Sequence, residues 1–148
     1  MVIVDDDSLA GPTRRMTRLE GLLVADRYRI ESVVTTGAST VVTEAVDITS
    51  DSPVTVKIVH PERAVASEFR RAVAQQIAVA RSLNHPNIAT VLDAGEVAID
   101  GEPTVFWVVE YLGGGSLRDL FDRGRLLQPS QALVVGLEAC RALDAAHT

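Results

Sequence analysis

Along the 148-residue chain, apolar and polar side chains begin to alternate near residue 27, and β-branched residues dominate up to residue 46. This period of two predicts two strands, separated by a turn at residues 35–40. A third strand is predicted at residues 54–59, after a turn-rich stretch. These segments predict an antiparallel meander that opens an α+β domain.

The spacing of apolar side chains changes to a helical period between residues 63 and 83. The sequence Asn-His-Pro-Asn at residues 84–87 ends this predicted helix. Two further strands are predicted at residues 88–92 and 104–111, with a hairpin-type turn at Asp100-Gly101 between them. The pattern therefore predicts one sheet of five antiparallel strands and one helix.

Three consecutive glycines at residues 113–115 predict a flexible joint. A short helix is predicted after it at residues 117–123, and a longer one at residues 129–147. The longer helix is apolar on nearly every side, so we expect it to be buried. Its Cys140 is expected to be a buried, unreactive thiol.

These elements divide the chain into three parts. Residues 1–25 show no sustained period and are predicted to be a loose leader. Met16 is a second plausible start, so we hypothesise that the residues before it belong to an over-extended reading frame. Residues 26–112 form the predicted sheet lobe, and residues 113–148 begin a second, helical lobe.

Composition narrows the possible functions. The chain has 14 basic and 20 acidic residues, a net charge of −6 and a pI near 5.0, which argue against a nucleic-acid partner. A single cysteine excludes an internal disulfide, and no apolar run reaches the ~20 residues of a membrane span. We therefore expect a cytoplasmic chain with no membrane segment. His60, His85 and His147 lie too far apart to predict a metal site.

Lys57 is the only lysine among the 14 basic residues, and it lies inside a β-branched strand. It shares a strand face with Thr55 and Val59. The residues on the opposite face are all apolar: Val54, Val56 and Ile58. This arrangement favours an ammonium group that meets an anion, and the alternative is a lysine that extends to solvent from an edge strand.

A turn that carries Gly37 precedes this strand. A glycine-bearing turn followed by a strand with a lysine is one arrangement that covers and neutralises nucleotide phosphates. An ordinary hairpin turn has the same pattern. Both interpretations remain open from this feature alone.

The order of motifs favours the first interpretation. Val-x-Val-Lys57 is followed by the amphipathic helix, Leu-Asn-His-Pro-Asn-Ile at 83–88, Trp-Val-Val-Glu-Tyr-Leu-Gly at 107–113 and Ser-Leu-Arg-Asp-Leu at 116–120. This order resembles the bacterial, actinobacterial-type serine/threonine protein kinase family over roughly residues 27–148. The resemblance implies a protein-kinase-like N-lobe, a hinge and the first two helices of the C-lobe.

The resemblance also implies roles for residues that would contact ATP. Gly37 matches the central glycine of the G-x-G-x-x-G loop, Val42 the apolar residue over the adenine, and Lys57 the lysine that holds the α and β phosphates. Thr35 and Thr40 replace the flanking glycines, which restricts the approach of the backbone to phosphate.

Further positions match or depart from the family pattern. Val109 matches the gatekeeper, and Glu110 and Leu112 match the hinge whose backbone groups pair with adenine. Thr55 replaces a small alanine against the adenine ring, which narrows that pocket or makes it more polar. These matches imply ATP as the ligand, with affinity reduced at Thr55.

The helix glutamate that pairs with the lysine in this family is replaced by Gln76. Gln76 lies seven residues after Phe69 and four before Ala80, on the helix face predicted to turn toward the sheet. A neutral amide there can still accept one hydrogen bond from Lys57. The alternative is a glutamine that faces inward without a role.

The last residues, 143–148, match the end of the helix that precedes the family's H-R-D-x-x-x-x-N catalytic loop. No residue of the chain can be assigned as catalytic or as a metal ligand, and Mg²⁺ is expected only if a missing C-lobe supplies its ligands. We expect an ATP-binding part of a kinase-family protein that cannot transfer phosphate alone.

A second hypothesis is a pseudokinase or interaction module that binds a partner protein and little or no nucleotide. On either hypothesis, the missing C-lobe or a partner is expected to cover the final helix. The resemblance also suggests a parent protein that is anchored in a membrane beyond residue 148. A simple α+β adaptor unrelated to kinases is the third interpretation.

Overall fold

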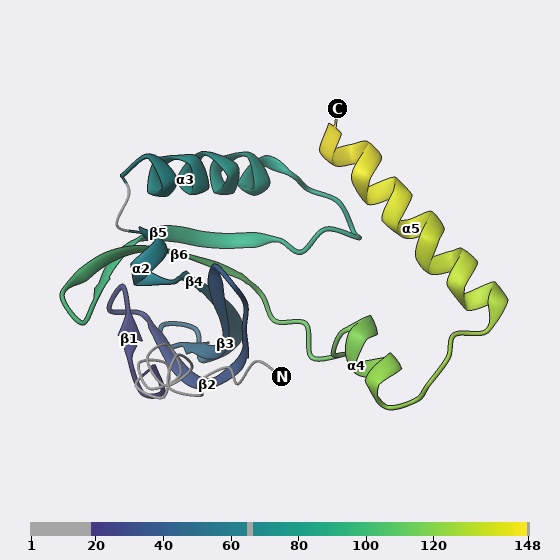
Figure 1. Ribbon diagram of the computed structural model, residues 1–148, viewed down its shortest axis with the longest axis horizontal. Coiled ribbons are helices and arrows are strands. Elements are labelled where there is room, and N and C mark those ends of the chain that lie inside the picture. Colours follow the sequence, from purple (N-terminus) through teal and green to yellow (C-terminus); the bar gives the residue numbers. More distant parts are fainter. Residues whose placement is uncertain (1–18, 65–66, 148) are drawn as a thin grey trace, which may run out of the picture.

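The computed structural model describes residues 19–64 and 67–147 (Figure 1). Its strands are β1 (Leu23–Val24), β2 (Tyr28–Thr36), β3 (Thr40–Asp47), β4 (Ser52–Val59), β5 (Val91–Ile99) and β6 (Glu102–Glu110). Its helices are α2 (Pro61–Ala64), α3 (Ser67–Ser82), α4 (Leu117–Asp122) and α5 (Pro129–His147). The α+β class predicted from the sequence is therefore confirmed.

The strands form one antiparallel sheet in the order β1-β2-β3-β4-β6-β5. It has one strand more than the five that were predicted. The additional strand is β1, which pairs with β2 after a turn in which Ala25 and Asp26 both have positive φ. Residues 19–24 were assigned to the leader, but Leu19 and Val24 are buried in the core. Residues 1–18 of that leader lie outside the described residues.

Two hydrophobic clusters cover the two faces of the sheet. The first consists of Leu19, Val24, Tyr28, Ile30, Val41, Ala45, Val54, Val56, Ile58, Phe106 and Val108. The second joins the opposite face to the helices and consists of Val59, Ala64, Ile77 and Val105, with Phe69, Val73, Val91, Ala94 and Trp107 packed against it. The alternation predicted for residues 54–59 of β4 is confirmed, because Val54, Val56 and Ile58 lie in the first cluster and Val59 lies in the second.

The predicted helix at residues 63–83 corresponds to α2 and α3, and α3 lies over β5 and β6 (Figure 1). The strand predicted at residues 88–92 was misplaced, since β5 begins at Val91 and runs to Ile99. The register of β5 is set by its hairpin with β6. The turn between them has the positive φ angles expected at Asp100 and Gly101.

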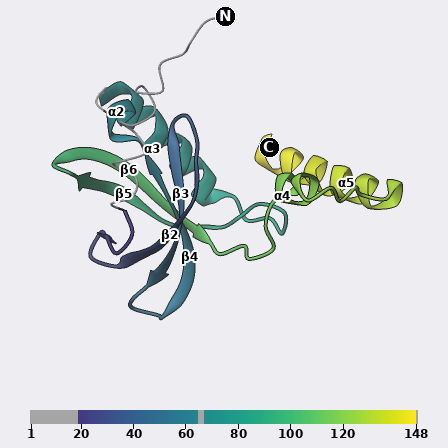
Figure 2. The ribbon, with the colours of Figure 1, turned by 60° about the horizontal axis from the view of Figure 1, so that its bottom comes forward.

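The two last helices lie to one side of the sheet, as Figure 2 shows from a second direction. Ser116 caps α4 in a reciprocal capping box with Asp119. In α5 no residue is buried, and the side chain of Cys140 is exposed. The expectation of a buried thiol was wrong because α5 packs against no other element of the described chain closely enough to bury a face. Asn87 hydrogen-bonds to the backbone carbonyl of Glu138 at 3.2 Å and also to its carboxylate.

Neither membrane nor metal features are found in the parts of the chain that the structure describes. None of the helices in residues 19–64 and 67–147 is long and apolar enough to cross a membrane. Over the same residues, no group of three or more histidine, cysteine, aspartate or glutamate side chains could hold a metal ion.

Candidate functional site

Lys57 lies at the centre of a row of side chains that crosses four strands. In the register of the sheet it is opposite Val42 on β3 and opposite Trp107 on β6, and Val42 in turn is opposite Thr35 on β2. Directly paired residues share a face of the sheet, so these four side chains leave it on the same side. We call this side the Lys57 face. The structure thus brings the predicted lysine next to the apolar residue predicted to cover the adenine.

A second row lies on the same face, two residues along β4 from Lys57 and nearer the predicted hinge. Thr55 is opposite Glu44 on β3 and opposite Val109 on β6. Val109 is only 7% exposed, so its side chain closes this end of the face. Glu44 accepts hydrogen bonds from Ser32 on β2 and from Tyr111 just after β6, both at 3.3 Å. The site residues on β3, β4 and β6 therefore form one continuous surface.

The predicted hinge begins at Glu110, the last residue of β6. Glu110 accepts a hydrogen bond from the Thr90 amide at 2.7 Å and donates its own amide to the Thr90 carbonyl at 3.1 Å. Hydrogen bonds from Thr90 to the carboxylate lower the pKa of Glu110. Leu112 is 63% exposed. The Glu110 carboxylate is thus engaged with Thr90.

The Gly37 turn connects β2 to β3 at the far end of this face. The Gly37 amide donates to the Thr40 carbonyl at 2.8 Å and closes the turn. A Cβ atom at Gly37 would lie 3.3 Å from that same oxygen, so a larger residue would press on the turn. A side chain at position 37 would therefore need the turn to shift by a few tenths of an ångström, whereas Thr35 and Thr40 occupy strand positions.

Gln76 does not meet Lys57. Ile77 is the buried residue of α3, and Gln76 beside it is exposed. Within the described residues, neither Lys57 nor Gln76 makes a hydrogen bond or ion pair with the other. The predicted hydrogen bond is absent because the apolar Ile77 takes the position against the sheet, which leaves the amide to water.

One contact in this region was missed by the sequence analysis. His60, which was considered only as a metal ligand and set aside, places its ring Nε2 2.8 Å from the carbonyl oxygen of Gly37. The two residues lie 23 positions apart, so no local pattern signals the contact. The only hint of this contact in the sequence is that His60 directly follows the strand that carries Lys57.

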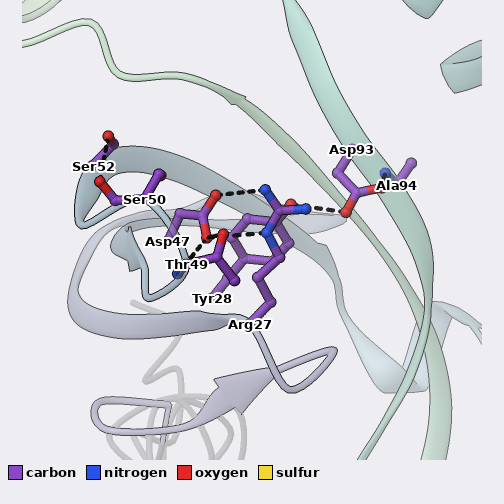
Figure 3. A network of polar contacts seen from close by, with 8 residues as sticks. All are labelled: Arg27, Tyr28, Asp47, Thr49, Ser50, Ser52, Asp93 and Ala94. Carbon is purple, nitrogen blue, oxygen red and sulfur yellow. Dashed lines mark hydrogen bonds and ion pairs between the residues drawn. The ribbon is translucent and has the colours of Figure 1, made fainter.

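A polar network away from the Lys57 face joins residues of β2, β3 and β5 (Figure 3). Arg27 donates two hydrogen bonds to Asp47, at 3.0 and 2.7 Å, and this pairing lowers the pKa of Asp47 and raises that of Arg27. The buried Tyr28 on β2 donates to Asp93 on β5 at 2.8 Å. Burial and this hydrogen bond raise the pKa of Tyr28 to about 12. Because β2 and β5 are not neighbours in the sheet, the bond joins strands across the core.

A cavity of about 210 Å³ lies between α3 and β5, on the same face of the sheet as Lys57. Its apolar lining includes Ala74, Ile77, Ala94 and Val105, with Arg81 and Glu96 also in its wall. It contains none of the residues predicted to contact a nucleotide. Ala94 pairs with Trp107, so the cavity adjoins the end of the Lys57 row at β5.

Comparison with known proteins gives a consistent result. A family profile described as the protein kinase domain matches residues 28–148. The chain is 32% identical over 124 residues to the serine/threonine-protein kinase PknB of Mycobacterium leprae, and 30% identical over 125 residues to a probable serine/threonine-protein kinase PknB of Corynebacterium glutamicum. The matches cover 84% of this chain but only 20% and 19% of those proteins.

Solved structures resemble the fold over a similar range. The kinase domain of PknI from Mycobacterium tuberculosis superposes with a TM-score of 0.70 at 27% sequence identity. The superposition covers 86% of this chain and 50% of that domain. The chain thus spans about half of the solved kinase domain and about a fifth of the curated relatives.

Proposed function

Because the chain belongs to the protein kinase domain family, we propose that its 148 residues form the nucleotide-binding part of a serine/threonine protein kinase and bind ATP on the Lys57 face of the sheet. The observation that carries this proposal is the row that places the only lysine of the chain directly opposite Val42. A cation beside an apolar side chain suits a ligand with an anionic end and an aromatic end. ATP has both.

The proposed contacts follow the order of the rows. Lys57 meets the α and β phosphates, and the backbone of the Gly37 turn covers them. Val42 lies over the adenine, and Val109 limits the depth of the pocket. The backbone of Glu110 and Leu112, at and just after the end of β6, pairs with the edge of the adenine.

Phosphoryl transfer needs more than these contacts. It requires an acidic residue that accepts the substrate proton and oxygen ligands for Mg²⁺, which neutralises the developing charge. No group of three or more histidine, cysteine, aspartate or glutamate side chains among residues 19–64 and 67–147 could hold a metal ion, so Mg²⁺ would need ligands from outside those residues. We propose that this chain alone binds nucleotide without transferring phosphate.

A second candidate function is that of a pseudokinase that uses the fold to bind a partner protein. It is favoured by the exposed Gln76, which leaves Lys57 without a carboxylate partner among the described residues. Thr35, Thr40 and Thr55 are further departures on the nucleotide face. All four changes weaken the expected hold on ATP.

Both candidate functions require another protein surface to cover the last two helices, α4 and α5. Their exposed large apolar side chains are Leu117, Phe121, Leu133, Val134, Val135, Leu137 and Leu143. An exposed apolar surface of this kind is typical of an interface. We propose that the remaining lobe of the kinase domain, or a partner in the pseudokinase case, covers it.

Titration of the chain with ATP tests the proposed function. Trp107 is the only tryptophan and lies directly opposite Lys57, so its fluorescence reports binding at this row. We expect a saturable change with ATP and a smaller affinity for adenosine, which lacks the phosphates. Absence of any saturable change with ATP, in a chain whose circular dichroism shows a folded sheet, would favour the pseudokinase.

A further inference from the structure

His60 is held firmly by its own backbone at the junction of β4 and α2. Its amide donates to the carbonyl of Ser39 at 2.9 Å, which extends the pairing between β4 and β3 by one residue. Its carbonyl accepts from the amides of Arg63 and Ala64 at 2.9 and 3.0 Å, in the first turn of α2. The backbone of His60 is therefore hydrogen-bonded on both sides before its ring makes any contact.

The His60 ring donates to the Gly37 turn. A carbonyl oxygen can only accept, so the Nε2 atom that lies 2.8 Å from the Gly37 oxygen must carry the proton. The ring is then either the Nε2–H tautomer or the imidazolium. This hydrogen bond joins the end of the Lys57 strand to the middle of the turn.

The direction of this bond decides where the turn presents its amides. His60 directly follows β4, and the bond from its amide to Ser39 continues the pairing with β3. Because side chains alternate along a strand, we expect the His60 side chain on the face opposite Lys57. The Gly37 carbonyl is drawn toward His60 on that opposite face. In a planar trans peptide unit the C=O and the following N–H point in opposite directions. The Ala38 N–H is therefore directed toward the Lys57 face.

The Ala38 amide is available for a ligand. Over the described residues it makes no hydrogen bond, while the neighbouring Gly37 amide is used by the Thr40 carbonyl. A backbone N–H beside an ammonium group is a suitable pair of donors for phosphate oxygens. The Ala38 amide is thus a free donor among the described residues, and the His60 contact sets its direction.

We propose that His60 is a positioning residue, which fixes the Gly37 turn so that the Ala38 amide faces the phosphates of a bound nucleotide. This proposal rests on the proposed function, because it concerns the same nucleotide. His60 itself does not contact the ligand. Its effect is confined to phosphates, since adenine and ribose are held by the rows nearer the hinge.

Two variants of His60 test the proposal by ATP and adenosine titration. His60→Phe keeps a ring but removes the donor, and we expect ATP to bind about five- to tenfold more weakly, the effect of one hydrogen bond. His60→Gln places an amide N–H near the position of Nε2 and should recover most of the affinity. Adenosine should bind equally to the parent chain and to both variants.

His85→Phe is the matched control, because the His85 ring accepts a bond from the Asn87 amide, far along the chain from the turn. It should leave both affinities unchanged. Equal ATP affinity of the His60→Phe variant and the parent chain would overturn the proposal and leave the proposed function standing. Equal loss of ATP and adenosine affinity would show a general structural role and overturn it as well.

The nitrogen spectrum of the histidine rings gives a readout that needs no nucleotide. In the parent chain at neutral pH, His60 should show a protonated Nε2, and a ring protonated only at Nδ1 would overturn the proposal. If the parent chain fails to bind ATP while His60 shows the expected tautomer, the hydrogen bond exists but the proposed function fails. The two failures are therefore distinguishable.

Discussion

Replacement of Lys57 by methionine should weaken ATP binding at least tenfold while leaving the fold nearly unchanged. Lys57 is half-buried, and over the described residues it makes no hydrogen bond or ion pair that its removal would leave unsatisfied. Methionine has a similar unbranched length and can occupy the same surface. We therefore expect the free energy of unfolding to change by less than about 0.5 kcal/mol, as for ordinary surface substitutions.

The loss of binding free energy for ATP should be much larger than this change in the free energy of unfolding. A hydrogen bond between a charged donor and phosphate contributes about 1.5–3 kcal/mol, which corresponds to about a 10- to 150-fold change in Kd. We expect the lower part of this range for Lys57, because no carboxylate among the described residues orients its ammonium group. Fluorescence titration of Trp107 with ATP measures the change directly.

The adjacent Val56→Ala substitution is the matched control. Val56 is fully buried on the opposite face, so the substitution should lower the free energy of unfolding by about 2 kcal/mol through lost burial and a small cavity. It should not change ATP affinity at temperatures where the chain stays folded. Unchanged ATP affinity in the Lys57→Met variant would refute the assignment of Lys57 to the phosphates.

Three further predictions follow from the contacts. Tyr28→Phe should lower the free energy of unfolding by about 1–2 kcal/mol in urea titrations, because the Asp93 carboxylate loses its donor; an unchanged midpoint would contradict this role. The pKa of Asp47 is lower in the folded chain than its ordinary value of ~4 in the unfolded chain, so the charged carboxylate stabilises the fold above pH ~4. This stabilisation is lost as the pH falls below that value. Urea midpoints at pH 6 and pH 3 should therefore differ less for Asp47→Asn than for the parent chain. Gln76→Glu should strengthen ATP binding if α3 can turn toward Lys57, and no gain would show that the exposed position persists.

The strands were predictable where their signal is local. The alternation in β4 depends only on neighbouring residues, and it correctly divided the two faces around Lys57. The strand β1 was missed because two residues carry no period and are stabilised by pairing with β2. Its turn also uses positive φ at Ala25 and Asp26, where the sequence has no glycine to signal it.

The limits of the prediction for the site have a similar cause. Phe69, Gln76 and Ala80 share one broad helical stripe, so the period could not say which residue of that stripe faces the sheet. Packing decides it, and Ile77 takes the buried position. The contact between His60 and Gly37 depends on the register of β3 with β4, which a single sequence does not fix.

The threonines that replace glycine in the turn and the contact from His60 both restrict the conformations of the Gly37 turn. β-Branched threonines at positions 35 and 40 have less backbone and side-chain freedom than glycines, so the turn samples fewer conformations before a ligand arrives. The bond from His60 restricts it further. A turn that is already ordered loses less conformational entropy on binding, but it cannot adjust to a phosphate that is displaced. Affinity at this site would then depend on whether the fixed direction of the Ala38 amide is correct, which is why His60 should affect ATP and not adenosine.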